Sequence, residues 1–244
     1  MTRFIVLTGG LAALLCATSG CVTDGNQDWS RSIGGVFGGG QSGPVTEKEI
    51  SAGLKEALSV GTQNVVLKVS KNNGYFSDEA IRIPLPGRLA TIQSKMAEAG
   101  LSEPLDDLQL KMNRAAERAA PQAERLFLNA IRSMTISDAV GILNGGDTAA
   151  TDFLQERTTH QLKAAFEPYV MSALKDVGAL QTAENVAGRY LPPHMVSDVR
   201  DELAEYAVSS AIEGLFYHIA AEEKAIRQDP VRRTTQLLQR VFGE

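Results

Sequence analysis

Hydrophobic residues recur at helical spacing from Thr46 onward. The first such run places its apolar and small side chains on one helix face: Ile50, Leu54, Ala57, Leu58, Gly61 and Val65. The sequence TEKE, from Thr46 to Glu49, has the form of a capping box, in which each of these two side chains accepts from the backbone N–H of the other. A helix is therefore predicted from Thr46, and the turn-forming run KNNGYFSD at 71–78 ends it.

A short extended strip is predicted next, at about residues 80–86. Its apolar side chains alternate along AIRIPLPG: Ile81, Ile83 and Leu85. Pro84 and Pro86 favour an extended backbone, so the strip should lie over the helices with these apolar side chains inward. Arg82 and Arg88 flank it, and each is a candidate either to bind an anion or to form a surface salt bridge.

Helical patterns fill the rest of the chain. They are predicted near 86–99, 103–119, 121–134, 135–144, 148–177, 179–190 and 197–227, with a last helix that Asp229 and Pro230 begin. Pro121 should kink or restart its helix, and Pro168 should kink another. No run of strands is evident in the sequence. The prediction is an all-α fold, a single multi-helix bundle over residues 46–244 with long kinked helices.

The N-terminus has the features of an export signal. Arg3 is followed by the apolar run FIVLTGGLAALLCA, which is shorter than the roughly 20 residues of a membrane-spanning helix. Thr18, Ser19 and Gly20 then precede Cys21, as in a bacterial lipobox, although Leu is usual where Thr18 stands. Residues 1–20 are therefore expected to be a signal peptide and Cys21 the lipidated residue. Ordinary secretion with cleavage nearby is the alternative.

Residues 21–45 are rich in Gly and Ser and show no periodicity, so they are expected to be a flexible tether behind Cys21. Val22, rather than Asp, follows that cysteine, a pattern of outer-membrane lipoproteins. The expected location is the periplasmic face of the outer membrane, with the lipid anchor as the membrane contact. Cys16 would leave with the signal peptide, so no intramolecular disulfide is expected.

The charge balance bears on possible partners. A formal net charge of -5 argues against a general nucleic-acid binder, which needs a basic surface to neutralise phosphates. No cofactor is predicted, and the oligomeric state is open.

The run NGGDT at 144–148 invites comparison with a phosphate-binding loop. Such a loop usually carries a Lys after its glycines, and none is present here. Asp147 would moreover repel a phosphate. We therefore interpret the run as a helix boundary, at which Gly145 and Gly146 end one helix and Asp147 and Thr148 cap the next.

Two Arg-Thr-Thr runs carry the most specific binding hypothesis. They comprise Arg157, Thr158, Thr159, Arg233, Thr234 and Thr235. Threonine is a mediocre helix former, so its pairing within helices indicates a packing or hydrogen-bonding demand. Either the two arginines line a polar pocket for an acidic ligand, or each pairs with a helix carboxylate such as Glu156 or Asp229.

Signals for catalysis and metal binding are weak. Glu156 and His160, like His218 and Glu222, are four residues apart on a helix, but no HExxH motif or Cys cluster accompanies them. No G-x-S-x-G motif occurs either. No catalytic or metal-binding residues are predicted. His218 should be a hydrogen-bonded core residue, and acidic pairs such as Glu222–Glu223 should be solvated helix faces.

Four motifs resemble an uncharacterised bacterial family of secreted or lipid-anchored proteins, domain of unknown function 4197. They are RIPLP at 82–86, ILNGGDTAAT at 142–151, RTT at 157–159 and RTTQLLQRVFG at 233–243. The resemblance extends from about residue 46 through the rest of the chain. It implies a single helical envelope domain, and it assigns no functional residues.

Taken together, these features predict a membrane-tethered binding or scaffolding protein of the bacterial periplasm, with an envelope protein or a lipid as possible partner. The first alternative is a carrier that holds a lipid or other hydrophobic ligand in a bundle cavity. The second is an enzyme of unrecognised type that uses the Arg/Thr motifs.

Overall fold

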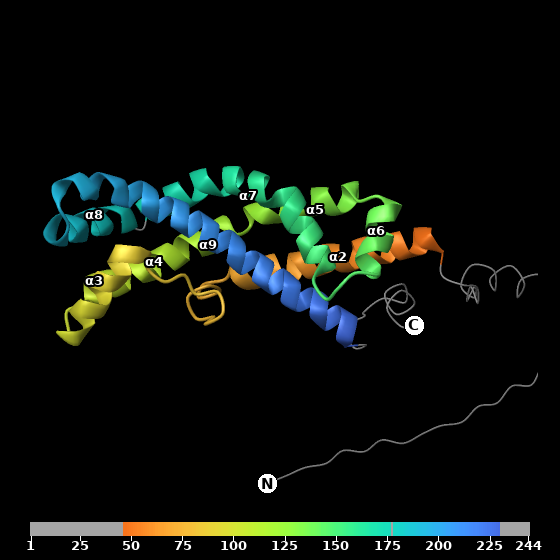
Figure 1. The fold of residues 1–244 in the computed structure, drawn as a ribbon, viewed down its shortest axis with the longest axis horizontal. Helices are drawn as coiled ribbons and strands as arrows, with labels where there is room; N and C mark the ends of the chain where they lie inside the picture. The colour runs from red at the N-terminus through yellow and green to blue at the C-terminus, as the bar shows by residue number, and fades with distance from the viewer. Residues whose placement is uncertain (1–45, 177, 230–244) are drawn as a thin grey trace, which may run out of the picture. The chain divides into compact units, whose positions relative to one another are not determined.

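Eight helices build the described part of the chain, residues 46–176 and 178–229 of a computed structural model (Figure 1). They are α2 (Glu47–Val69), α3 (Gly87–Glu98), α4 (Glu103–Ala119), α5 (Gln122–Ser133), α6 (Ile136–Leu143), α7 (Ala149–Asp176), α8 (Ala179–Tyr190) and α9 (Pro193–Gln228). Within these residues no strand occurs, so the all-α prediction is confirmed.

Capping boxes start two of the helices. At α2, the Thr46 hydroxyl accepts from the Glu49 N–H, and the Glu49 carboxylate accepts from the Thr46 N–H at 2.9 Å. Thr135 and Asp138 form the same reciprocal pair at α6. Each box satisfies two backbone donors that a helix start leaves without partners, as the sequence predicted for Thr46.

Prolines set three of the boundaries and bends. Pro121 is the N-cap of α5 and so restarts the helical path after α4, while Pro168 lies inside α7. The sequence prediction that the long C-terminal helix begins at Ser197 is wrong, because α9 begins one turn earlier, at Pro193. Proline suits the first turn of a helix, where its missing N–H would have had no partner.

Small residues let the helices approach one another in the core. Alanines at 115, 116, 119, 120 and 123 are all fully buried. Large side chains fill the remaining space, and the rings of Phe127 and Phe216 meet edge to face with centroids 5.7 Å apart. The long helix α9 crosses α7 and α2 (Figure 1), so it closes this core.

The segment between α2 and α3, residues 70–86, is not helical, and we call it the anchored loop. Its second part is the strip at 80–86, which leaves a turn at residues 80 and 81; Ile81, Ile83 and Leu85 are buried while Arg82 and Pro84 are exposed. The predicted strip, with its alternating apolar side chains directed inward, is therefore confirmed.

Within the described ranges, no single helix is both long and apolar enough to cross a membrane. Among these described residues, the criteria of length and composition are met only by α5 and α6 taken together, across a bend of 102°.

Candidate functional site

The anchored loop is fixed to the bundle by buried polar side chains, the first of which is Asn113 of α4. Its amide oxygen accepts from the Ile83 N–H at 2.9 Å, and its amide nitrogen donates to the Ile83 carbonyl at 2.8 Å. One side chain thus satisfies both backbone groups of Ile83, as a neighbouring strand would. Asn113 is fully buried, so the position of the strip is tightly fixed.

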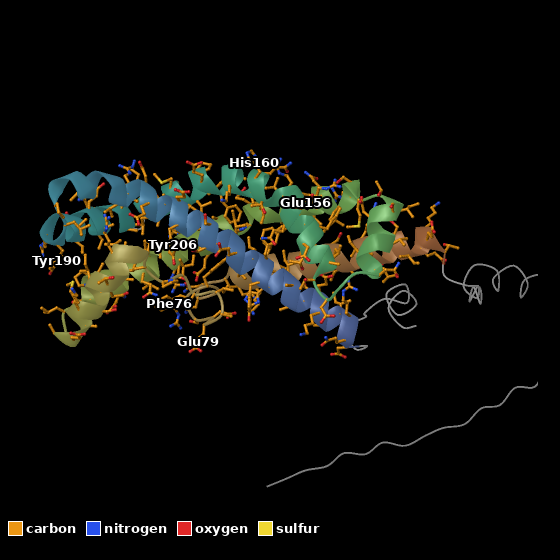
Figure 2. All side chains as sticks on the ribbon, in the orientation of Figure 1. Phe76, Glu79, Glu156, His160, Tyr190 and Tyr206 are labelled. Carbon is orange, nitrogen blue, oxygen red and sulfur yellow. The ribbon has the colours of Figure 1, made fainter. Side chains whose placement is uncertain are left out.

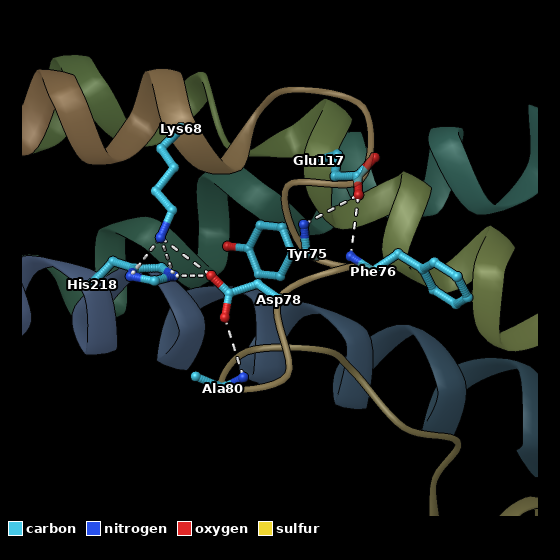
Figure 3. Close-up of polar contacts among 7 residues, drawn as sticks. All are labelled: Lys68, Tyr75, Phe76, Asp78, Ala80, Glu117 and His218. Atoms are coloured by element: carbon cyan, nitrogen blue, oxygen red, sulfur yellow. Dashed lines mark hydrogen bonds and ion pairs between the residues drawn. The ribbon is translucent and has the colours of Figure 1, made fainter.

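A second anchor is the buried carboxylate of Glu117, one turn further along α4. It accepts from the backbone N–H groups of Tyr75 and Phe76, at 3.2 and 3.4 Å (Figure 3). Arg114 pairs with the same carboxylate at 2.7 Å and also donates to the Asn73 amide oxygen. The charge of Glu117 is therefore compensated while it holds the turn of the loop.

Tyr75 is the apolar anchor of the loop. The side chain is fully buried, and its hydroxyl donates to the Ala211 carbonyl of α9 at 2.7 Å. Burial, with a smaller effect of the Glu117 charge, raises the pKa of Tyr75 well above its ordinary value of 10. This hydroxyl therefore stays protonated as a donor.

Lys68, Asp78 and His218 form a third anchor, which we call the polar cluster (Figure 3). His218 Nε2 lies 2.9 Å from Asp78 Oδ2, and Lys68 Nζ lies 3.2 Å from the same oxygen. Lys68 Nζ is also 3.4 Å from each ring nitrogen of His218. The cluster links α2, the loop and α9, and it confirms His218 as a hydrogen-bonded core residue.

The electrostatics of the polar cluster favour a neutral imidazole beside an ionised carboxylate. Burial and the nearby Lys68 charge lower the pKa of His218, and Asp78 offsets only part of this effect. Burial raises the pKa of Asp78, but hydrogen bonds from Lys68 and the Ala80 N–H, with the electrostatic effect of His218 and Lys68, bring it below its ordinary value. Both ring nitrogens of His218 contact Lys68 or Asp78. Since Asp78 belongs to the loop, these contacts hold the loop against α2 and α9.

Two glycines allow the loop to pack this closely. A Cβ at Gly74 would lie 2.3 Å from the Val69 carbonyl oxygen, and one at Gly214 of α9 would lie 2.7 Å from Tyr75 Cε1. The backbone at the end of α2 and the tyrosine ring therefore occupy the space that a side chain would need.

The strip and α9 enclose a groove of about 250 Å³, which we call the strip groove. It is lined by Ala80, Ile81, Arg82, Ile83, Pro84, Tyr206, Ser210, Glu213, Gly214 and Tyr217. Tyr217 is 54% exposed, and Figure 2 labels Tyr206 on α9 near the loop that carries Phe76. Because the three polar anchors and Tyr75 fix the loop, the wall that the strip contributes to this groove is held in place.

Arg82 is held in place at the strip groove by Phe76. Its Nε donates to the Phe76 carbonyl, and its guanidinium lies over the Phe76 ring, 5.4 Å from the centroid. Among residues 46–176 and 178–229, no acidic side chain lies within ion-pair distance of it. Of the two predicted roles, this placement differs from a surface salt bridge and leaves the terminal amino groups available to an anion.

The first Arg-Thr-Thr run lies elsewhere, on α7. Arg157 is exposed and lies over the Phe153 ring, with its guanidinium carbon 4.9 Å from the centroid. Thr158 donates to the Leu154 carbonyl at 2.7 Å and Thr159 donates to the Gln155 carbonyl. These hydroxyls are directed into their own helix, and Arg157 is not among the residues of the strip groove. Arg233, Thr234 and Thr235 lie outside the described residues.

The start of α7 corrects two predictions. Glu223 of α9 accepts from the Ala150 and Thr151 N–H groups at 2.9 and 2.8 Å, and from the Thr151 hydroxyl at 2.8 Å. The cap at these two N–H groups therefore comes from Glu223 and not from Asp147, which faces Lys224 and Gln228. Glu223 is also buried, and so is not part of a solvated face.

Arg227 completes the junction that Glu223 begins. It pairs with Glu223 at 2.9 Å and donates to the carbonyls of Ile142 and Leu143, at the end of α6. The positive start of α7 thus meets an internal carboxylate, and the carbonyl end of α6 meets a guanidinium. The helix start that a phosphate would have needed is occupied by Glu223.

Metal coordination has no supporting geometry in the part of the chain that the structure describes. No group of three or more His, Cys, Asp or Glu side chains is placed to hold an ion there.

The fold and the site define a class of protein: an all-α helical domain with a rigidly anchored loop and an open polar groove. The sequence matches the family described as Protein of unknown function (DUF4197) over residues 44–243, and the chain belongs to this family. No curated protein and no solved structure matches this chain. The resemblance found in the four motifs is thereby confirmed.

Proposed function

We propose that this protein is a membrane-tethered binding module of the bacterial periplasm, and that the strip groove holds an extended peptide segment of another envelope protein, with one acidic side chain of that segment at Arg82. The observation that carries the proposal is Arg82, whose guanidinium is positioned at the groove by Phe76 and has no acidic partner among the described residues. A guanidinium fixed in this way loses little freedom when it binds a carboxylate.

The composition of the groove supports a binding role. Tyrosine and arginine are the side chains that most often dominate binding energy at protein interfaces, since they combine large contact area with hydrogen bonding. Here Tyr206, Tyr217 and Arg82 line the groove together with the polar side chain of Ser210. Glu213 in the same groove would select against a uniformly acidic ligand, so one acidic side chain next to neutral or basic neighbours fits best.

The dimensions favour an extended ligand. From Tyr206 to Tyr217, α9 runs for three turns, roughly 16 Å at 1.5 Å per residue. An extended peptide rises about 3.3 Å per residue, so about five residues would span this length. The opposite wall is the strip, which is itself extended.

The tether supports the location. Arg3, the following apolar run and Cys21 have the pattern of a lipoprotein signal, and residues 21–45 have the composition of a flexible linker. Anchoring would confine the groove to the membrane surface and raise its effective concentration toward partners held there.

A photo-crosslinking experiment in the native host tests the proposal. The photoreactive amino acid p-benzoylphenylalanine replaces Tyr217 in the full chain, and the matched control carries it at Tyr169, which is similarly exposed on α7. The proposal expects an adduct only from position 217, mapping by mass spectrometry to a peptide segment that contains an acidic residue. Adding Arg82→Ala should reduce its yield at least about tenfold, the effect of losing 1.4 kcal/mol of binding energy.

Several outcomes would reject the peptide-binding function. These are no adduct from position 217, equal adducts from 217 and 169, or an adduct that persists with Arg82→Ala. An adduct to a lipid would favour the carrier alternative. Arg82→Ala should itself leave folding intact, because an exposed cation–π contact contributes only about 0.5–1 kcal/mol.

A further inference from the structure

A second groove lies between α7 and α9 and shares no residue with the strip groove. It has a volume of about 370 Å³ and is lined by Lys163, Glu167, Met171, Asp201, Ala204, Glu205, Val208 and Ser209. We call it the α7–α9 groove. In Figure 1 these two helices lie next to each other, and both are continuous through the lining positions.

The floor and rim of the α7–α9 groove differ in chemistry. Ala204 and Val208 are buried and Met171 is half-buried, so the floor is apolar. The rim carries three exposed carboxylates, those of Glu167, Asp201 and Glu205, against the single ammonium of Lys163. Three negative charges and one positive charge leave the groove with a net charge of -2.

We propose that the α7–α9 groove binds a basic amphipathic helix of a partner protein. An apolar floor between two helical rims is the surface that the apolar face of a helix fills, with anchors at every third or fourth residue. The carboxylates of the rim then face the Lys or Arg side chains that border such a stripe. From Lys163 to Met171 the wall extends roughly 12 Å at 1.5 Å per residue, which accommodates about two turns of the partner helix.

The α7–α9 groove is a separate surface from the strip groove, and its proposed ligand, a basic helix, differs in chemistry from an extended peptide. A protein with both surfaces would hold two different segments at once, which is the minimum that a scaffold requires. Neither proposal depends on the other, because the two grooves are lined by different residues.

Fluorescence anisotropy with the full chain and a labelled peptide tests this inference. The probe is a 14-residue helical peptide of Leu and Lys, with Leu along one face; a scrambled peptide of the same composition lacks the face. We expect the wild-type protein to bind the amphipathic peptide at least about tenfold more tightly than the scrambled one, a difference of 1.4 kcal/mol. Met171→Gln should weaken binding severalfold, because it preserves length but removes an apolar contact.

Charge reversal supplies the matched comparison. Glu167→Lys with Glu205→Lys should weaken binding at least about tenfold at low ionic strength and less in high salt. Glu156→Lys with Glu98→Lys makes the same change in net charge at exposed positions outside the groove and should have little effect. The inference is overturned if the wild type does not bind, if the scrambled peptide binds equally, or if both double variants lose the same affinity.

Discussion

Glu223 and Arg227, four residues apart on α9, hold the ends of two other helices. The carboxylate of Glu223 receives the N–H groups at the start of α7, and the guanidinium of Arg227 donates to the carbonyls at the end of α6. The two side chains also pair with each other at 2.9 Å. The turn between α6 and α7 is therefore held by a distant helix in addition to its own backbone hydrogen bonds.

Removal of the Glu223 carboxylate should be strongly destabilising. Glu223→Ala leaves the Ala150 and Thr151 N–H groups and the Arg227 guanidinium without their buried acceptor. Breaking a buried ion pair in this way lowers the free energy of unfolding by about 3–5 kcal/mol. Urea denaturation measures the loss. Glu156→Ala, at an exposed position of α7, should change stability by less than about 0.5 kcal/mol. Equal effects of the two variants would show that Glu223 has no such role.

Asn113→Asp should loosen the strip. The new carboxylate can still accept from the Ile83 N–H, but it cannot donate to the Ile83 carbonyl and would instead repel it. A cost of about 3 kcal/mol is expected for an unsatisfied buried group with charge. Hydrogen exchange should rise across residues 70–86. Asn129→Asp makes the same substitution at an exposed site on α5 and should leave both stability and exchange unchanged.

Gly214→Ala and Gly188→Ala should have opposite effects, although both positions lie within helices. A methyl group at 214 would lie 2.7 Å from Tyr75 Cε1, so overpacking of about 1–3 kcal/mol is expected. Nothing lies within 4 Å of the corresponding position at 188, where alanine should stabilise the helix by about 0.5–1 kcal/mol. Thermal unfolding of both variants checks this. A stable Gly214→Ala protein would contradict the close packing of Tyr75 on α9.

Stability should decline as the pH falls below about 6.5, the unfolded pKa of histidine. The pKa of His218 is lowered in the folded protein, so the unfolded chain binds more protons at this ring in that range. The pKa of Asp78 is also lowered, and its contribution is lost only in stronger acid, below its ordinary value of 3.8. Urea unfolding at pH 7.5 and pH 5.5 should show a smaller decline for His218→Gln than for the wild type. His160→Gln, at an exposed site, should retain the wild-type decline.

Lipidation should depend on Cys21. Metabolic labelling with an alkyne fatty acid should modify the wild-type protein and not Cys21→Ser, and only the wild type should sediment with membranes. Fractionation of inner from outer membranes then locates it. If Cys21→Ser is labelled as strongly as the wild type, Cys21 is not the lipidated residue and the proposed lipid anchor is wrong.

Local patterns predicted much of the fold. The capping box at Thr46, the restart at Pro121 and the alternating strip all follow from interactions between residues close in sequence. Helix starts that depend on distant residues were predicted less well. Asp147 had the right residue type for a cap, but Glu223 accepts from the N–H groups there, and no local pattern indicates which distant carboxylate can reach a helix start.

The candidate site was predicted only in part. Arg82 was identified from its position in the strip, whereas Asn113 and Glu117, which anchor the loop, were missed. A signal for both was present, because they lie one turn apart on the buried side of α4, next to Met112 and Ala116. Polar residues on an apolar face require buried partners. The sequence alone does not reveal that these partners are backbone groups of the loop.

The contacts of α9 also bear on the order of folding. Tyr75 bonds to Ala211, Asp78 to His218, and Ala150 to Glu223, across separations of 136, 140 and 73 residues. Contacts between residues so far apart in sequence slow folding, because the chain loses conformational entropy before the contacts form. During synthesis, the loop and the start of α7 lack these partners until α9 has left the ribosome. The N-terminal helices should therefore remain loosely packed in the nascent chain, and a chain truncated before α9 should be readily degraded.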